Sequence, residues 1–132
     1  MDRYYDYDRY TALAHVDLGK TKEMSTRLLG ASGGEIGAYQ MMCSVFATQP
    51  DLSKAAYTFG MSLTQEALGK RDREYMFLSM ASAISGFLHE RAKALDFGRQ
   101  AVEAALKDPH APAPFVEFLK RNVQTLEADK GK

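Results

Sequence analysis

The sequence predicts an all-α protein of about seven helices, and three observations support this prediction. Apolar residues recur at intervals of three and four positions, which is the spacing of one helix face, rather than at the alternating positions of a strand. Proline, which interrupts helices, is confined to positions 50, 109, 112 and 114. The stretches TFGMSLTQEALGK (58–70) and DFGRQAVEAALKD (96–108) are similar, with Phe59 and Phe97 standing 38 positions apart.

The expected helices are separated by short segments of polar residues, glycine or proline. Their approximate ranges are 3–17, 20–30, 34–48, 51–69, 73–90, 92–107 and 113–128. Gly19–Thr21 is expected to form a turn between the first two helices. Ser32 and Glu35 have the spacing of a capping box and are expected to start the third helix. Asp51 and Asp72 are N-cap candidates for the fourth and fifth helices.

The end of the chain carries two prolines that fit the start of a helix. Pro112 and Pro114 suit the first turn of the last helix, because an amide hydrogen there has no partner within the helix. All the connections between helices are short, so successive helices should be antiparallel neighbours. The length of the chain is that of a single domain, 1–132.

The 38-residue repeat extends to the helix that precedes each of the two similar stretches. Each of these helices carries two large side chains, a small one and another large one on a single face. The two quartets are Tyr39, Met42, Cys43, Phe46 and Phe77, Met80, Ala81, Ile84. A side chain as small as Cys or Ala lets a second helix approach closely, while the large ones interlock around it. Each repeat unit is therefore expected to be a pair of packed helices.

This pattern resembles the tetratricopeptide (TPR) repeat, a helix-turn-helix unit. Its first helix carries Trp-x2-Leu-Gly-x2-Tyr and its second carries Ala-x3-Phe. The two quartets match the first motif in side-chain size but not in identity. Ala55-x3-Phe59 matches the second motif, whereas the next unit has Lys93 in place of the alanine. The period of 38 residues is longer than the usual period of about 34.

The resemblance implies a short α-solenoid of stacked antiparallel helix pairs. Its units would be at about 3–31, 34–70 and 72–108, with a capping helix at 113–128 that covers the end of the stack. The first unit has no clean quartet. An irregular helical bundle is the alternative fold.

The overall composition argues against two classes of partner. Seventeen basic and seventeen acidic side chains cancel, so the chain has no net field to attract nucleic acid or an anionic membrane. No basic patch of any size stands out along the sequence. No apolar run approaches the roughly 20 residues that a membrane-spanning helix needs. The first ten residues, MDRYYDYDRY, do not resemble a signal peptide, so the cytoplasm is the expected location.

The short motifs that suggest chemistry lack the residues that would complete them. GKT (19–21) is not a phosphate-binding loop, because Ala14 stands where that loop needs glycine. DFG (96–98) lacks the other elements of a kinase. None of the three histidines is preceded by Glu at the third position, as a helical di-metal site would require. Cys43, the single cysteine, stands in an apolar run and is expected to be a buried, reduced thiol. We expect no catalytic residue, no cofactor and no metal.

The resemblance implies a non-enzymatic adaptor or scaffold that binds a peptide or a helix of another protein on the concave face of its repeats. The positions that would face this partner are Asp8, His15, Gln40, Ser44, Thr48, Tyr75, Leu78, Ser82 and Ser85. This face is neutral and mildly apolar. The small residues of SMASAISG (79–86) offer another surface that could pack tightly against a helix of a partner or of a second copy. A small all-helical enzyme or ligand-binding bundle is the alternative function.

The N-terminal segment YYDYDRY is rich in tyrosine, which provides a large contact area with a polar tip. One helix face is too narrow to bury all of these rings. Self-association as a homodimer through Tyr4, Tyr5 and Tyr7 is one interpretation. Packing of the segment as an N-terminal cap is the other.

Overall fold

The structure is a computed structural model that describes residues 3–128, with side chains from residue 6 onward. Within this range the chain forms seven α-helices and no strand, which confirms the predicted all-α class. The helices are α1 (Arg3–Val16), α2 (Leu18–Ser32), α3 (Ile36–Thr48), α4 (Lys54–Leu68), α5 (Glu74–Phe87), α6 (Arg91–Lys107) and α7 (Ala113–Ala128).

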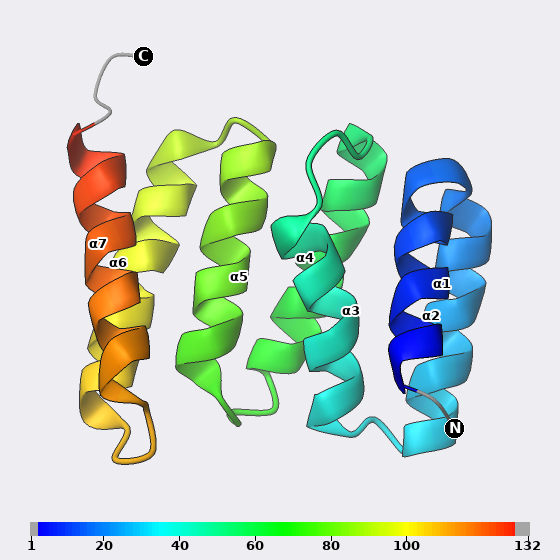
Figure 1. The fold of residues 1–132 in the computed structure, drawn as a ribbon, viewed down its shortest axis with the longest axis horizontal. Coiled ribbons are helices and arrows are strands. Elements are labelled where there is room, and N and C mark those ends of the chain that lie inside the picture. Colours follow the sequence, from blue (N-terminus) through cyan, green and yellow to red (C-terminus); the bar gives the residue numbers. More distant parts are fainter. Residues whose placement is uncertain (1–2, 129–132) are drawn as a thin grey trace.

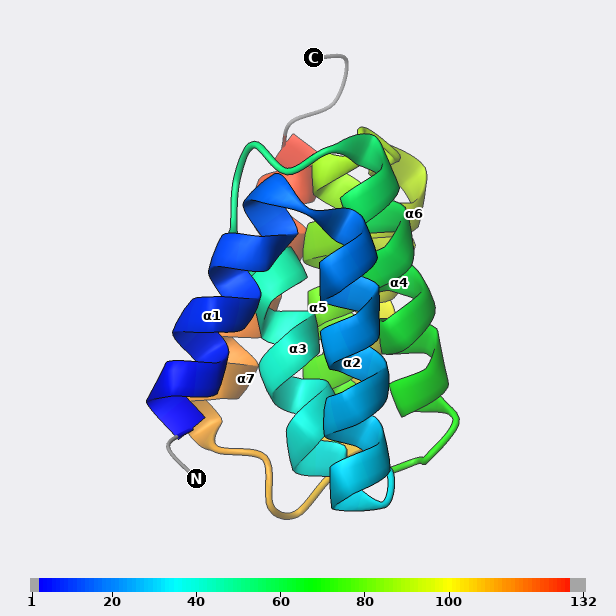
Figure 2. The same cartoon turned by 90° about the vertical axis from the view of Figure 1, so that its right-hand side faces the viewer.

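The helices lie in two layers. Figure 1 shows the pairs α1–α2, α3–α4 and α5–α6 following one another from right to left, with α7 at the far end of the row. The view in Figure 2 separates the layer of odd-numbered helices from the layer of even-numbered helices. Within the first of these layers, α3 packs against both α1 and α5. This arrangement places α1 and α7 at opposite ends of the molecule.

The first helix boundary differs from the prediction. The side chain of Asp17 accepts a hydrogen bond from the backbone amide of Lys20, with a distance of 3.0 Å, and so starts α2. Gly19–Thr21 therefore lies in the first turn of a helix rather than in a turn between helices. A carboxylate at this position also interacts favourably with the helix dipole.

The expected capping box before α3 does not form. Ser32 belongs to the end of α2, and its hydroxyl donates to the carbonyl of Leu29. Gly33, with φ of 66°, ends α2 in the left-handed conformation, which glycine adopts without steric cost. Glu35 precedes α3, but its side chain makes no capping hydrogen bond.

The N-caps of α4 and α5 also differ from the prediction. Ser53, rather than Asp51, accepts the capping hydrogen bond from the amide of Ala56, with a distance of 3.0 Å. Asp51 lies in the preceding turn with φ of 65°. Arg73, rather than Asp72, directly precedes α5, and it too has a left-handed backbone, with φ of 57°.

The repeat seen in the sequence corresponds to a repeat of buried positions. Tyr39, Cys43 and Phe46 are buried in α3, and so are their counterparts Phe77, Ala81 and Ile84 in α5. The second helices agree as well. Their equivalent buried pairs are Ala56 and Ala94, Gly60 and Gly98, Leu63 and Ala101, and Ala67 and Ala105. The two units therefore use the same faces of their helices to form the core.

The core contains two clusters of buried side chains. The larger one joins α1 to α5 and includes Tyr10, Met42 and Phe46. Phe46 meets Tyr10 and Phe59 edge-on, with ring centroids 5.9 Å apart in each pair. The smaller cluster joins α5, α6 and α7 through Tyr75, Leu78, Ala101, Ala105 and Leu119.

The two repeated glycines have different surroundings. A Cβ atom placed on Gly60 would lie 2.4 Å from Cγ of Phe46, which is far inside van der Waals contact. A Cβ atom on Gly98 would lie 3.3 Å from Cγ2 of Val123 and 3.4 Å from Oγ of Ser82. Glycine is therefore required sterically at position 60, whereas at position 98 a methyl group needs only small shifts.

We expect Gly60→Ala to lower the free energy of unfolding by about 1–3 kcal/mol, because overpacking displaces the Phe46 ring. The matched change Gly98→Ala should be close to neutral, since the gain in helix propensity of about 1 kcal/mol offsets a tighter contact. Chemical denaturation followed by circular dichroism measures both. Equal effects of the two changes would contradict the assigned role of Gly60.

Candidate partner-binding groove

A groove of about 530 Å³ opens on the layer of odd-numbered helices, between α3, α5 and α7. Each of these three helices contributes side chains to its wall, and none of the lining side chains is charged. They are Ser44, Ala47, Thr48, Met76, Ser79, Met80, Ser82, Ala83, Gly86, Phe115, Phe118, Asn122, Thr125 and Leu126.

The floor of the groove on α5 is built from small residues. Ser79, Ser82, Ala83 and Gly86 follow one another at the spacing of a single helix face. Small side chains let another chain approach the helix backbone closely. On the α7 side, Phe115 and Phe118 form the wall, and Phe118 is 50% exposed. The groove thus has a low floor beside a high aromatic wall.

Four of the five hydroxyl groups that line the groove, all except that of Ser79, donate a hydrogen bond to a backbone carbonyl. Ser44 donates to the carbonyl of Met41 at 2.8 Å, and Thr48 donates to the carbonyl of Ser44 at 2.7 Å. Ser82 donates to the carbonyl of Ala94 on the neighbouring helix at 2.6 Å. Because these protons point at the backbone, the groove offers mainly methyl, methylene and aromatic surface to an occupant.

Two interactions hold α7 at the edge of the groove. The rings of Tyr75 and Phe115 meet with centroids 5.5 Å apart, near the start of α7. Near the other end of α7, Nη2 of Arg91 donates to the carbonyl of Leu126 at 2.6 Å. The aromatic wall is therefore attached at both of its ends.

The structure brings three of the predicted partner-facing residues into this groove. Ser44 and Thr48 lie on its α3 side, and Ser82 lies on its α5 floor. The stretch 79–86, singled out in the sequence for its small side chains, provides most of the floor. Whether these residues bind a partner stays a prediction.

Three other predicted residues lie inside the fold rather than on a free face, which corrects their placement. Tyr75 and Leu78 are each only 8% exposed and belong to the cluster shared with α6 and α7. Ser85 is fully buried, and its hydroxyl has no hydrogen-bond partner among the described residues. The sequence pattern predicted that these residues face a partner, whereas Tyr75 and Leu78 pack against α6 and α7 and Ser85 is buried within the protein.

The remaining predicted residues lie outside the groove. Asp8 is exposed on α1. Nε2 of His15 lies 3.1 Å from Oε1 of Gln49, and Gln40 accepts a hydrogen bond of 2.6 Å from Arg73. The side chains of His15 and Gln40 are thus engaged by other segments of the chain.

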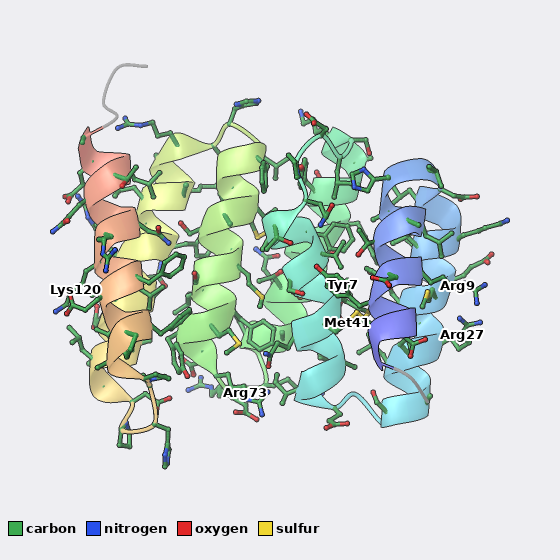
Figure 3. The ribbon with its side chains drawn as sticks, in the orientation of Figure 1. Tyr7, Arg9, Arg27, Met41, Arg73 and Lys120 are labelled. Carbon is green, nitrogen blue, oxygen red and sulfur yellow. The ribbon has the colours of Figure 1, made fainter. Side chains whose placement is uncertain are left out.

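The predicted self-association residues are only partly described. The side chains of Tyr4 and Tyr5 lie outside the described residues. Tyr7 is half-buried against the larger cluster, and Figure 3 shows it with Met41 in the space between α1 and α3. The described tyrosine of this trio therefore contributes to packing, as the interpretation of the segment as a cap expected.

The contribution of α7 to the groove was not predicted from the sequence. This helix was expected to have a capping role, although its apolar residues occur at helical spacing on both sides of Leu119. The exposed Phe118 follows Phe115 by three positions, so both rings lie on the same side of α7. This three-residue spacing is the sequence feature from which an aromatic face on α7 could have been predicted.

The thiol of Cys43 is buried, as predicted. Burial raises its pKa from 9.0 to about 12, although a hydrogen bond with Thr64 opposes this shift. Burial also raises the pKa of Tyr10, whose hydroxyl lies 2.6 Å from that of Ser25. Both groups stay neutral at physiological pH and act as core residues.

Among the described residues, no three His, Cys, Asp or Glu side chains gather closely enough to hold a metal ion. None of the described helices combines the length and the apolar character needed to cross a membrane.

Comparison with protein-family models, with curated proteins and with solved structures found no match for this chain. The TPR resemblance therefore rests on the residue pattern of the chain itself.

The burial of Cys43 predicts slow reaction with thiol reagents. At pH 8 we expect the native protein to react with Ellman's reagent far more slowly than the protein unfolded in guanidinium, because the thiolate is the reactive form. The raised pKa also means that the native state holds a proton which the unfolded state loses above pH 9, so stability should fall as the pH rises from about 9 towards 12. Equally fast labelling of the native and unfolded protein would contradict this assignment.

Proposed function

We propose that the protein is a non-enzymatic, TPR-like scaffold whose groove between α3, α5 and α7 binds an apolar helix or peptide segment of a partner protein. The observation that carries the proposal is the uncharged lining of the groove. Small side chains form its floor, and Phe115 and Phe118 form one wall. An amphipathic helix that lays its apolar face in a groove is a common mode of protein recognition.

The exposure of Phe118 supports the same occupant. Aromatic residues are enriched in protein interfaces, and the exposed half of the Phe118 ring provides apolar surface that a partner can cover. The groove also lies on the layer of α3 and α5, the first helices of the two repeat units. In TPR-like stacks these helices line the binding face, so the repeat analogy and the groove favour the same surface. We place this scaffold in the cytoplasm as part of the proposal.

A small apolar ligand is the second candidate, and the size of the groove favours it. Its volume of about 530 Å³ lies within the range of about 300–1,000 Å³ that is usual for small-molecule sites. The extended, open lining over three helices favours a chain-like occupant over a compact one. The hydroxyl groups of Ser44, Thr48 and Ser82 already donate hydrogen bonds to backbone carbonyls. This favours a groove that binds its ligand by shape over one that catalyses a reaction.

Filling the groove or adding a charge to its wall should weaken binding. Peptides selected from a displayed random library on the wild-type protein would be measured against Ala83→Trp, which places a large ring on the floor, and against Thr48→Arg, which introduces a charge at an exposed position of the wall. We expect apolar peptides whose affinity falls at least about tenfold in both variants, because burying an unpaired charge or losing the contact area removes binding energy.

The matched control is Gln65→Trp, which adds the same ring at an exposed position of α4 in the other layer and should leave binding unchanged. Circular dichroism checks that each variant is folded. Selected peptides that are predominantly charged, or that bind Ala83→Trp as tightly as wild type, would rule out the groove as the binding site.

A further inference from the structure

A second concave surface lies at the outer end of the row, on the hairpin of α1 and α2. Its volume is about 420 Å³, and it is lined by Arg9 and Leu13 of α1 and by Lys20, Glu23, Met24 and Arg27 of α2. Figure 3 shows Arg9 and Arg27 extending from the two helices towards the same side, away from the rest of the molecule. Two basic side chains from different helices therefore line the same small hollow.

The charges of this surface are not balanced locally. Three basic side chains and one carboxylate line it, which gives a net charge of +2 on a chain whose total is zero. Among the described residues, the ion pairs within 4 Å all lie in or next to α6 and α7. They are Glu90–Lys93, Arg99–Glu127, Glu103–Lys107 and Glu117–Lys120. At the α1–α2 end, no described carboxylate comes this close to Arg9, Lys20 or Arg27.

Two apolar side chains contribute to the floor of this otherwise polar surface. Leu13 is half-buried and Met24 is buried, and both line the hollow between the cations. A ligand that is only an anion would leave this floor uncovered. A segment that combines carboxylates with an apolar side chain would match both the floor and the charged edge.

We propose that the α1–α2 surface binds an acidic peptide segment of a second partner, with carboxylates on Arg9, Lys20 and Arg27 and an apolar side chain over Leu13 and Met24. This site is independent of the groove between α3, α5 and α7. The scaffold would then hold one uncharged and one acidic segment at different places along the row of helices.

Two other occupants fit this surface less well. The carboxylates at the α6–α7 end are paired with their own cations, so that end of a second copy offers little complementary charge. Two copies that met through their α1–α2 ends would bring the arginines together. A nucleic acid usually engages a longer basic track, whereas only three cations gather here and two apolar side chains lie between them.

The test uses a synthetic peptide of alternating Glu and Leu that carries a neutral fluorophore, with binding measured by anisotropy on the full chain. The control peptide has Gln in place of each Glu. We expect the acidic peptide alone to bind, with an affinity that falls as salt is added. Arg9→Glu and Arg27→Glu should each weaken binding about tenfold, because each change replaces a favourable charge with a repulsive one.

The matched control variant is Arg121→Glu. It makes the same change of net charge at an exposed position of α7, at the end of the molecule opposite to α1 and α2, and should leave binding unchanged. An equal loss in Arg121→Glu would show a non-specific charge effect and overturn the proposal. Three other results would also overturn the proposal. The Gln peptide could bind equally well, the acidic peptide could fail to bind up to about 1 mM, or a single-stranded DNA of the same length could bind more tightly than the acidic peptide. Variants that fill the groove should bind this peptide normally, so the two sites are tested separately.

Discussion

The contact between Gly60 and Phe46 is the constraint on which the first half of the molecule depends. The absence of a side chain at position 60 lets the Phe46 ring lie directly against the backbone of α4. The same ring meets Tyr10 of α1 and Phe59 of α4 edge-on. Three helices therefore converge on one aromatic side chain, and the distance between α3 and α4 is set by glycine.

The second repeat unit uses the same plan with a different neighbour. Ile84 takes the position of Phe46 and is smaller, while the space over Gly98 is approached by Val123 of α7 and by the hydroxyl of Ser82. The repeated glycine thus serves helix pairing in one unit and the docking of α7 in the other. The last helix packs closely on α6 and meets α5 through the rings of Phe115 and Tyr75, and the groove opens between α5 and α7.

The sequence alone was sufficient for the features that depend on local periodicity. The helical spacing predicted seven helices within a few residues of their observed ends. The quartets around Cys43 and Ala81 identified buried faces, except that Met80 of the second quartet is half-buried and lines the groove. The first residue of each helix was harder to predict. Asp51 and Ser53 are both good N-cap residues, and the conformation of the turn determines which of them caps α4. Single-sequence patterns do not contain that information.

The surface sites depend on long-range packing and were predicted less well. Tyr75 and Leu78 were assigned to a free face because the docking of α7 on this part of α5 and α6 leaves no local signal in the sequence. The cluster of Arg9 with Arg27 is not visible as a basic patch along the sequence for the same reason. Its members are brought together by the hairpin of α1 and α2, and Lys20 joins Arg27 only through the seven-residue spacing of one helix face.

The bond from Arg91 to the carbonyl of Leu126 has a consequence for how rigid the molecule is. The last carbonyls of a helix have no partner within the helix and carry the negative end of its dipole, so a guanidinium there both satisfies and neutralises them. Because Arg91 is the first residue of α6, this hydrogen bond acts as a clamp that links the C-terminal end of α7 to the N-terminal end of α6. The clamp should therefore suppress fraying at the end of α7. Because α6 also packs more extensively on α5 than any other two helices pack on each other, α5, α6 and α7 should move as one unit.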